Sequence, residues 1–175
     1  MQVLYFHGLN SGPQSPKFLA IQKQWPQAKC FYWTPTEKQL SQRIKTLAVE
    51  MSTSTKDVLI IGDSAGSNLA LQFRTEITKA NSWCKLIIIA PIFNTKQLID
   101  SSILPKNIID QIVTVATLND AMLLLPREDE ILDYSEIPGQ VLRSTEVKRI
   151  PGGHAVLGFS RYIKDMVLFS NTIAV

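Results

Sequence analysis

The stretch Gly62-Asp63-Ser64-Ala65-Gly66 decides the fold through the residues on either side of it. Before it, Asp57-Val58-Leu59-Ile60-Ile61 is a short β-branched apolar run, typical of a buried parallel strand. After it, Leu69, Phe73 and Ile77 recur at helical spacing. The order strand, Gly-x-Ser-x-Gly, helix predicts a nucleophile elbow, a sharp turn that lifts a serine hydroxyl above the edge of the sheet. The alternative is a glycine-rich turn with a capping serine.

Apolar runs and helical patterns alternate along the rest of the chain. We expect strands near 2–6, 29–33, 57–61, 85–90, 121–125 and 145–150, and helices near 16–25, 37–51, 66–79, 134–142 and 155–169. Such alternation predicts an α/β protein with a mostly parallel sheet of about six strands and helices on both faces. We interpret residues 1–175 as one domain, a size that can bury a substantial core.

The segment Thr95–Leu118 has no single interpretation. Ile108, Ile109 and Ile112 favour a helix, whereas Val113-Thr114-Val115 favours a short strand. The segment is too short to form a lid domain. We therefore expect the site to be open to solvent.

A serine nucleophile needs a base, which is usually a histidine. The chain has two histidines, His7 and His154. In an α/β-hydrolase the base follows the nucleophile and the acid, on the loop after the final strand. His154 fits that place, directly after the strand-like Glu146–Ile150. His7 comes too early, and we interpret it as a structural residue of the loop after the first strand. Without Ser64, an ordinary loop histidine would be the better interpretation of His154.

The acid of such a triad should lie between the nucleophile and the base, at the end of a strand. The expected strand at 121–125 is followed by four acidic residues: Glu128, Asp129, Glu130 and Asp133. Spacing alone does not choose among them, although Glu128 and Asp129 lie nearest the strand. Asp63 is set aside, because its side chain should diverge from that of its neighbour Ser64.

Two backbone N–H groups are expected to form an oxyanion hole. One belongs to Ala65, the residue after the nucleophile, and the other to Leu9, on the loop after the first strand. Substrate-binding walls are expected at the carboxyl ends of strands, where α/β sheets bind ligands. The residues at those positions are Asn10, Ser11, Pro91 and Ile92.

Three motifs make the chain resemble the YqiA-like small esterases, a branch of the α/β-hydrolases without a cap. His7-Gly8-Leu9-Asn10-Ser11-Gly12-Pro13-Gln14-Ser15-Pro16-Lys17 is similar to that family's opening His-Gly-Phe-Asn-Ser-Ser-Pro-x-Ser-x-Lys. Asp129-Glu130-Ile131-Leu132-Asp133-Tyr134 resembles its Asp-Glu-Val-Leu-Asp-Tyr, whose first aspartate is the triad acid. Gly152-Gly153-His154-Ala155 resembles its Gly-Gly-x-His-Ala-Phe, which contains the base. The resemblance implies a minimal α/β-hydrolase fold without a lid domain, a triad of Ser64, Asp129 and His154, and carboxylic-ester hydrolysis.

The chain departs from the family pattern at three positions. Ser67 stands where the family carries a second glycine after the elbow, and Val156 replaces a phenylalanine. His154 follows Gly153 directly, without the family's intervening residue. This one-residue difference bears on where the imidazole lies.

Composition narrows the classes of function. A net charge of +3 with dispersed basic residues does not favour a nucleic-acid partner. Apolar runs are too short for a membrane span, and the first residues lack a secretion signal. Two cysteines, Cys30 and Cys84, indicate buried thiols in a reducing, cytoplasmic compartment. We expect neither a metal nor an organic cofactor, and no feature specifies an oligomeric state.

The sequence thus predicts a serine hydrolase that cleaves a small acyl ester or thioester through an acyl-enzyme intermediate. Two alternatives remain at this point. The same triad also serves peptidases and carbon–carbon hydrolases. A protein of this fold can also bind a ligand or partner without catalysis.

Overall fold

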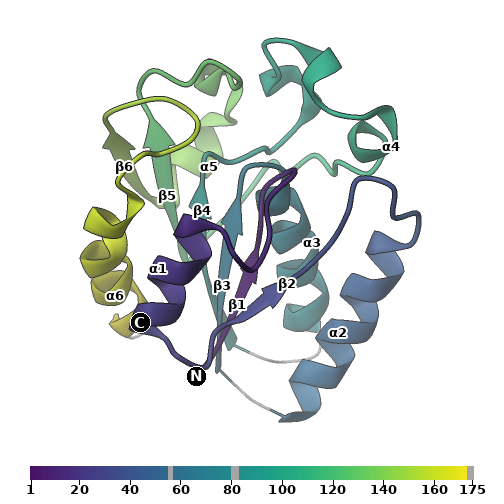
Figure 1. The fold of residues 1–175 in the computed structure, drawn as a ribbon, viewed down its shortest axis with the longest axis vertical. Coiled ribbons are helices and arrows are strands. Elements are labelled where there is room, and N and C mark those ends of the chain that lie inside the picture. Colours follow the sequence, from purple (N-terminus) through teal and green to yellow (C-terminus); the bar gives the residue numbers. More distant parts are fainter. Residues whose placement is uncertain (55–56, 80–82, 173–175) are drawn as a thin grey trace.

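The computed structural model of the protein describes residues 1–54, 57–79 and 83–172. In these residues, six parallel strands form one sheet in the order β2-β1-β3-β4-β5-β6 (Figure 1). The strands are β1 (Gln2–Phe6), β2 (Lys29–Phe31), β3 (Asp57–Asp63), β4 (Trp83–Ile89), β5 (Ala121–Pro126) and β6 (Glu146–Ile150). The α-helices are α1 (Pro16–Gln24), α2 (Leu40–Ser54), α3 (Ala65–Lys79), α4 (Lys106–Ile109), α5 (Gly139–Arg143) and α6 (Ile163–Asn171).

Side chains of each strand alternate between two apolar layers. In β3, Val58 and Ile60 pack into the layer that holds α2 and α3, whereas Leu59 and Ile61 pack into the layer that holds α1 and α6. Figure 1 shows α1 beside α6 and α2 beside α3. Because both faces are covered, the central strands β1, β3, β4 and β5 are nearly continuous apolar runs, whereas the edge strands β2 and β6 also carry exposed charged residues. The predicted α/β class with helices on both faces of the sheet is confirmed.

The strand order reverses next to β1. The chain passes from β1 to β2 on one side and then returns to β3 on the other side of β1. Open α/β sheets bind ligands at such a switch point, outside the carboxyl ends of the strands. The elbow after β3 and the loop after β1 both lie there. The topology therefore brings Ser64 and Leu9 to one edge of the sheet.

Two expected helices are shorter than predicted. The helix expected at 134–142 is a 3-10 turn, Tyr134–Glu136, followed by α5. Pro138 divides them, because a proline disfavours helical backbone in the residue before it. The helix expected at 155–169 begins only at Ile163, after the 3-10 turn Phe159–Tyr162. Gly158, with a left-handed φ of 69°, precedes that turn.

The segment between β4 and β5 contains neither a long helix nor the short strand considered at 113–115. It folds into the 3-10 turns Thr95–Gln97 and Ser101–Ile103, then α4, then irregular chain. Its buried side chains, including Leu98, Leu104 and Ile108, pack onto the α2 and α3 layer. Across the described part of the chain, none of the helices is both long enough and apolar enough to span a bilayer.

Candidate active site

Ser64 occupies a sharp turn between β3 and α3. Its φ of 50° lies in the left-handed region, which non-glycine residues adopt at a cost and mostly at functional sites. The turn is held by the Ser64 N–H, which donates to the Ile89 carbonyl at 2.9 Å. The Ser64 carbonyl accepts from the Ser67 N–H at 2.8 Å. This is the strained strand–turn–helix geometry that the pentapeptide predicts.

The two glycines of the pentapeptide lie where the backbone comes too close for a side chain. A Cβ on Gly62 would lie 2.7 Å from the Cα of Ser67. A Cβ on Gly66 would lie 2.2 Å from the carbonyl oxygen of His7. Rigid backbone cannot yield as a flexible side chain can, so both positions require glycine.

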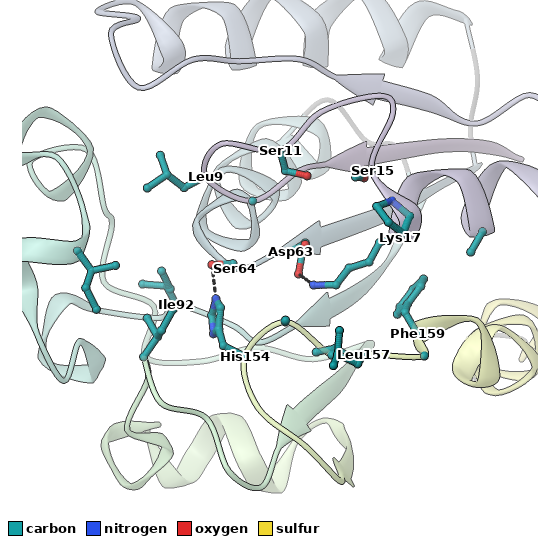
Figure 2. A pocket seen from close by; sticks show the side chains of 18 of the residues that line it. Leu9, Ser11, Ser15, Lys17, Asp63, Ser64, Ile92, His154, Leu157 and Phe159 are labelled. Atoms are coloured by element: carbon teal, nitrogen blue, oxygen red, sulfur yellow. Dashed lines mark hydrogen bonds and ion pairs between the residues drawn. The ribbon is translucent and has the colours of Figure 1, made fainter.

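The structure brings Ser64, His154 and Asp129 together. His154 Nε2 lies 2.7 Å from Ser64 Oγ, as Figure 2 shows. His154 Nδ1 lies 3.0 Å from each oxygen of Asp129. The imidazole is therefore within hydrogen-bond reach of the serine hydroxyl, although His154 directly follows Gly153. The side chains of His154 and Asp129 are 13% and 1% exposed.

Asp129 is the best-satisfied carboxylate of its loop. Its Oδ1 accepts from the backbone N–H groups of Ile131 and Leu132, both at 2.9 Å, and its Oδ2 accepts from the Tyr134 hydroxyl. Burial opposes ionisation, but the hydrogen bonds from His154, Tyr134 and Ile131 outweigh it and hold the pKa of Asp129 below its usual value. Asp129 is therefore ionised at neutral pH and fixes the proton of His154 on Nδ1.

The other three acids of the loop have different positions. Glu130 Oε2 accepts from the backbone N–H of His154 at 3.0 Å and does not contact the ring. Asp133 is exposed and caps the turn Tyr134–Glu136 by accepting from the Ser135 N–H at 2.8 Å. Glu128 is exposed. Sequence spacing left these four open, whereas the geometry places only Asp129 against the imidazole.

The expected oxyanion donors lie beside Ser64. Leu9 and its neighbour Gly8 line the same cavity as Ser64, and a Cβ on Gly8 would lie 3.3 Å from the Ser64 Cβ. Ala65 begins α3, so its N–H belongs to the first helical turn, whose donors have no partner within the helix. Neither N–H has a partner among the hydrogen bonds of the described residues.

His7 is buried away from the Ser64 hydroxyl. Its Nε2 accepts from the Trp33 N–H at 3.1 Å, and its Nδ1 lies 2.7 Å from the Gly8 carbonyl. These partners fix the neutral tautomer with the proton on Nδ1. Burial lowers the pKa of His7 below its usual value, although the hydrogen bond to Gly8 acts in the opposite direction. The ring thus fastens the loop after β1 to the chain after β2.

A cavity of about 610 Å³ opens beside Ser64 and His154. Figure 2 shows Ile92 and Leu9 on one side of Ser64, and Lys17, Leu157 and Phe159 on the other. Leu98, Ile103 and Leu104, from the segment between β4 and β5, also line the cavity. This segment walls part of the site without forming a separate domain.

The predicted wall residues divide into two pairs. Ser11 and Ile92 line this cavity, and Asn10 and Pro91 do not. Asn10 has a left-handed φ of 56° and lines a neighbouring depression instead. Pro91 is buried, and its carbonyl accepts from the Gln97 side chain at 3.2 Å. Position after a strand end did not reveal which side chains face the cavity.

Three side chains of the site, Ser67, Lys17 and Asp63, have contacts that were not predicted from the sequence. The Ser67 hydroxyl accepts from the Ile92 N–H at 2.8 Å, so this serine holds the loop after β4. Lys17 forms an ion pair with Asp63 at 2.7 Å on the cavity wall. Lys17 belongs to the motif at residues 7–17, but its pairing with Asp63 was not predicted. No group of three or more His, Cys, Asp or Glu side chains in the described residues is arranged to hold a metal ion.

Comparisons with known proteins identify the fold. No protein-family model and no curated protein matches the chain. Among solved structures, an α/β superfamily hydrolase from Oenococcus oeni is 13% identical, with a TM-score of 0.69, 98% of this chain covered and 93% of that one. The surfactin-cyclising thioesterase domain SrfTE is 14% identical, with a TM-score of 0.68 and coverages of 99% and 93%.

A putative YdeN-like hydrolase from Pectobacterium atrosepticum is 16% identical, with a TM-score of 0.66, 97% of this chain covered and 90% of that one. Identities this low establish the fold alone. The protein has the α/β-hydrolase fold in a minimal, six-stranded form, and the described residues contain no lid domain.

Proposed function

We propose that the protein is a serine hydrolase that cleaves carboxylic esters or thioesters through Ser64, His154 and Asp129. The observation that carries the proposal is the continuous hydrogen-bonded chain from Ser64 Oγ to His154 Nε2, at 2.7 Å, and from His154 Nδ1 to Asp129, at 3.0 Å. Along the sequence the serine comes first, the aspartate second and the histidine last, which is the order in the α/β-hydrolases. The hydrolases and thioesterases of the same fold support the reaction class by analogy.

In the proposed reaction, Ser64 Oγ attacks the substrate carbonyl while its proton passes to His154 Nε2. The backbone N–H groups of Leu9 and Ala65 stabilise the oxyanion that forms. His154 then returns the proton to the leaving oxygen or sulfur, and the acyl group remains on Ser64. Water, deprotonated by His154, attacks the acyl-enzyme, and His154 passes that proton to Ser64 Oγ as the acid is released. Asp129 stays ionised and stabilises the imidazolium in both steps.

We further propose that the chain is a relative of the YqiA-like small esterases. The motifs at 7–17, 129–134 and 152–155 support this proposal, together with the minimal fold. Ser67 and His154 depart from the family pattern, but both have defined roles in this structure. Ser67 holds the Ile92 backbone, and the His154 ring reaches Ser64.

Labelling with a fluorophosphonate tests the proposal, because the probe requires an activated serine rather than a mere pocket. We expect one adduct, mapped to Ser64, that is absent in Ser64→Ala and strongly reduced in His154→Ala. A folded protein that takes no label would indicate a binding protein of this fold instead. A panel of thioesters, esters and peptide amides then assigns the bond that is cleaved.

A further inference from the structure

The cavity has an apolar half and a second half in which polar side chains lie beside the apolar Leu157 and Phe159. The half beside Ile92 is lined by apolar side chains that also pack onto the α2 and α3 layer, namely Leu9, Ile92, Leu98, Leu104 and Ile131. The other half contains four polar side chains from the loop after β1, from α1 and from the elbow, namely Ser11, Ser15, Lys17 and Asp63. Figure 2 shows Lys17 and Ile92 on opposite sides of the Ser64–His154 pair.

The Lys17–Asp63 pair presents donors rather than acceptors to the cavity. Lys17 Nζ lies 2.7 Å from Asp63 Oδ1, and the Tyr5 hydroxyl donates to Asp63 Oδ2 at 3.2 Å. Both carboxylate oxygens are thus engaged. An ammonium group has three donors, and Asp63 is the only hydrogen-bond partner of Lys17 within the described residues. The Ser11 hydroxyl has no partner among those residues and lines the same cavity.

The chemistry at His154 indicates which half receives the leaving group. Under the proposed function, His154 returns its proton to the leaving atom, so the leaving group must lie next to the imidazole. The chain after His154 continues to Leu157 and Phe159, and Figure 2 places both with Lys17. The leaving group therefore fits between this loop and Lys17, and the acyl chain fits the apolar half.

We propose that Lys17 and Ser11 form a subsite for an uncharged hydrogen-bond acceptor, such as a hydroxyl, ether or carbonyl oxygen, in the leaving group. This inference rests on the proposed function. The subsite favours an uncharged acceptor over an anion, because the Asp63 carboxylate already neutralises Lys17 and would repel a second negative charge beside it. The subsite disfavours a purely alkyl leaving group, because such a group would cover the Lys17 ammonium and the Ser11 hydroxyl without accepting a hydrogen bond from them, which costs free energy.

Three butyrate esters of similar size test the subsite: propyl, 2-hydroxyethyl and carboxymethyl butyrate. The quantity to measure is kcat/KM for the 2-hydroxyethyl ester divided by kcat/KM for the propyl ester. This ratio is determined for the wild-type protein and for Lys17→Met and Ser11→Ala. Comparison of one ratio across variants cancels the intrinsic reactivity of the two esters. Lys79→Met is the matched control, since it removes a lysine from an exposed ion pair with Glu76 on α3.

We expect the ratio to fall about tenfold in Lys17→Met and about threefold in Ser11→Ala, as loss of a charged and of a neutral hydrogen bond predicts. It should not change in Lys79→Met. If Lys17→Met does not fold because Asp63 is left unpaired, the double variant Lys17→Met/Asp63→Asn and Ser11→Ala carry the test. An unchanged ratio in folded Lys17 and Ser11 variants would overturn the subsite. A wild-type protein that prefers the carboxymethyl ester to the 2-hydroxyethyl ester would overturn it as well.

Failure of the proposed function has a different signature. Hydrolysis that is unchanged in Ser64→Ala, or absent for all three esters, overturns both the triad and the subsite. Hydrolysis that depends on Ser64 but not on Lys17 or Ser11 overturns the subsite alone.

Discussion

The Glu130 carboxylate accepts a hydrogen bond from the backbone N–H of His154 at 3.0 Å. The two residues lie on different loops, after β5 and after β6. A Cβ on Gly153, the residue before His154, would lie 2.4 Å from Glu130 Oε2, so a side chain there would displace this carboxylate. Asp129 thus holds the imidazole, while the adjacent Glu130 holds the backbone that carries it.

Glu130→Ala should lower kcat by about two- to tenfold, the value of one net hydrogen bond, because the His154 loop loses its anchor. Glu130→Gln keeps an acceptor oxygen and should retain most of the activity. Glu128→Ala serves as the control, since Glu128 is an exposed acid of the same loop. Steady-state kinetics on a simple aryl ester measures all three. Equal losses in Glu128→Ala and Glu130→Ala would contradict the anchoring role.

The acid of the triad is tested by two conservative changes. Asp129→Asn should reduce kcat by a factor on the order of 10⁴, the loss found when the same change is made in a well-studied Ser-His-Asp triad. Asp133→Asn should cost far less, because Asp133 is exposed and only caps a 3-10 turn. Circular dichroism checks that both variants are folded. The reverse ranking would show that Asp129 is not the acid.

The buried His7 predicts a pH dependence of stability. Its pKa in the folded protein lies below the ordinary value of 6.5, so the unfolded state binds more protons below that pH. The free energy of unfolding should therefore fall as the pH drops below about 6.5, by at most about 1.4 kcal/mol per pH unit. Urea unfolding at pH 7.5 and pH 5.5 measures the change, and His7→Gln should show a smaller one. Equal slopes in the two proteins would contradict this account of His7.

Gly66→Ala should prevent folding or remove activity, because its Cβ would lie 2.2 Å from the His7 carbonyl oxygen and 2.4 Å from that of Phe6. Gly139→Ala is the matched control. Its nearest neighbour is the flexible end of Arg143 at 3.4 Å, and alanine favours a helix over glycine. Thermal unfolding should show a large loss for the first variant and no loss for the second. A stable, active Gly66→Ala would contradict the close approach of β1 and α3.

The order of the elements could be predicted from the sequence because buried parallel strands are continuous apolar runs. The elbow could be predicted because its glycines and serine are adjacent in sequence. Helix ends were less predictable, although Pro138 marks the point at which the helix expected at 134–142 divides. The walls of the cavity were predictable only in part: Ser11 and Ile92 follow strand ends, whereas Lys17 and Leu104 reach the site only through tertiary packing.

Under the proposed function, the apolar half of the cavity sets the length of acyl chain that the site can bury. A site without a wall beyond Ile92 would bury only short acyl chains, but Leu98 and Leu104 extend the wall. We expect kcat/KM on aryl esters to rise about fourfold per methylene, from roughly 0.8 kcal/mol of burial, until this half is filled, and then to level off. Leu104→Trp should move the plateau to shorter chains and leave acetate esters almost unaffected. A plateau unchanged by this substitution would place the acyl chain elsewhere.

The most direct measurement of the central claim is the mass of the intact protein during turnover of p-nitrophenyl acetate. The account predicts an acetyl adduct on Ser64, formed together with a stoichiometric burst of p-nitrophenol. Neither should occur in Ser64→Ala. Ester hydrolysis that persists in Ser64→Ala, or a folded wild-type protein that forms no adduct and no product, would contradict the assignment of Ser64 as the nucleophile.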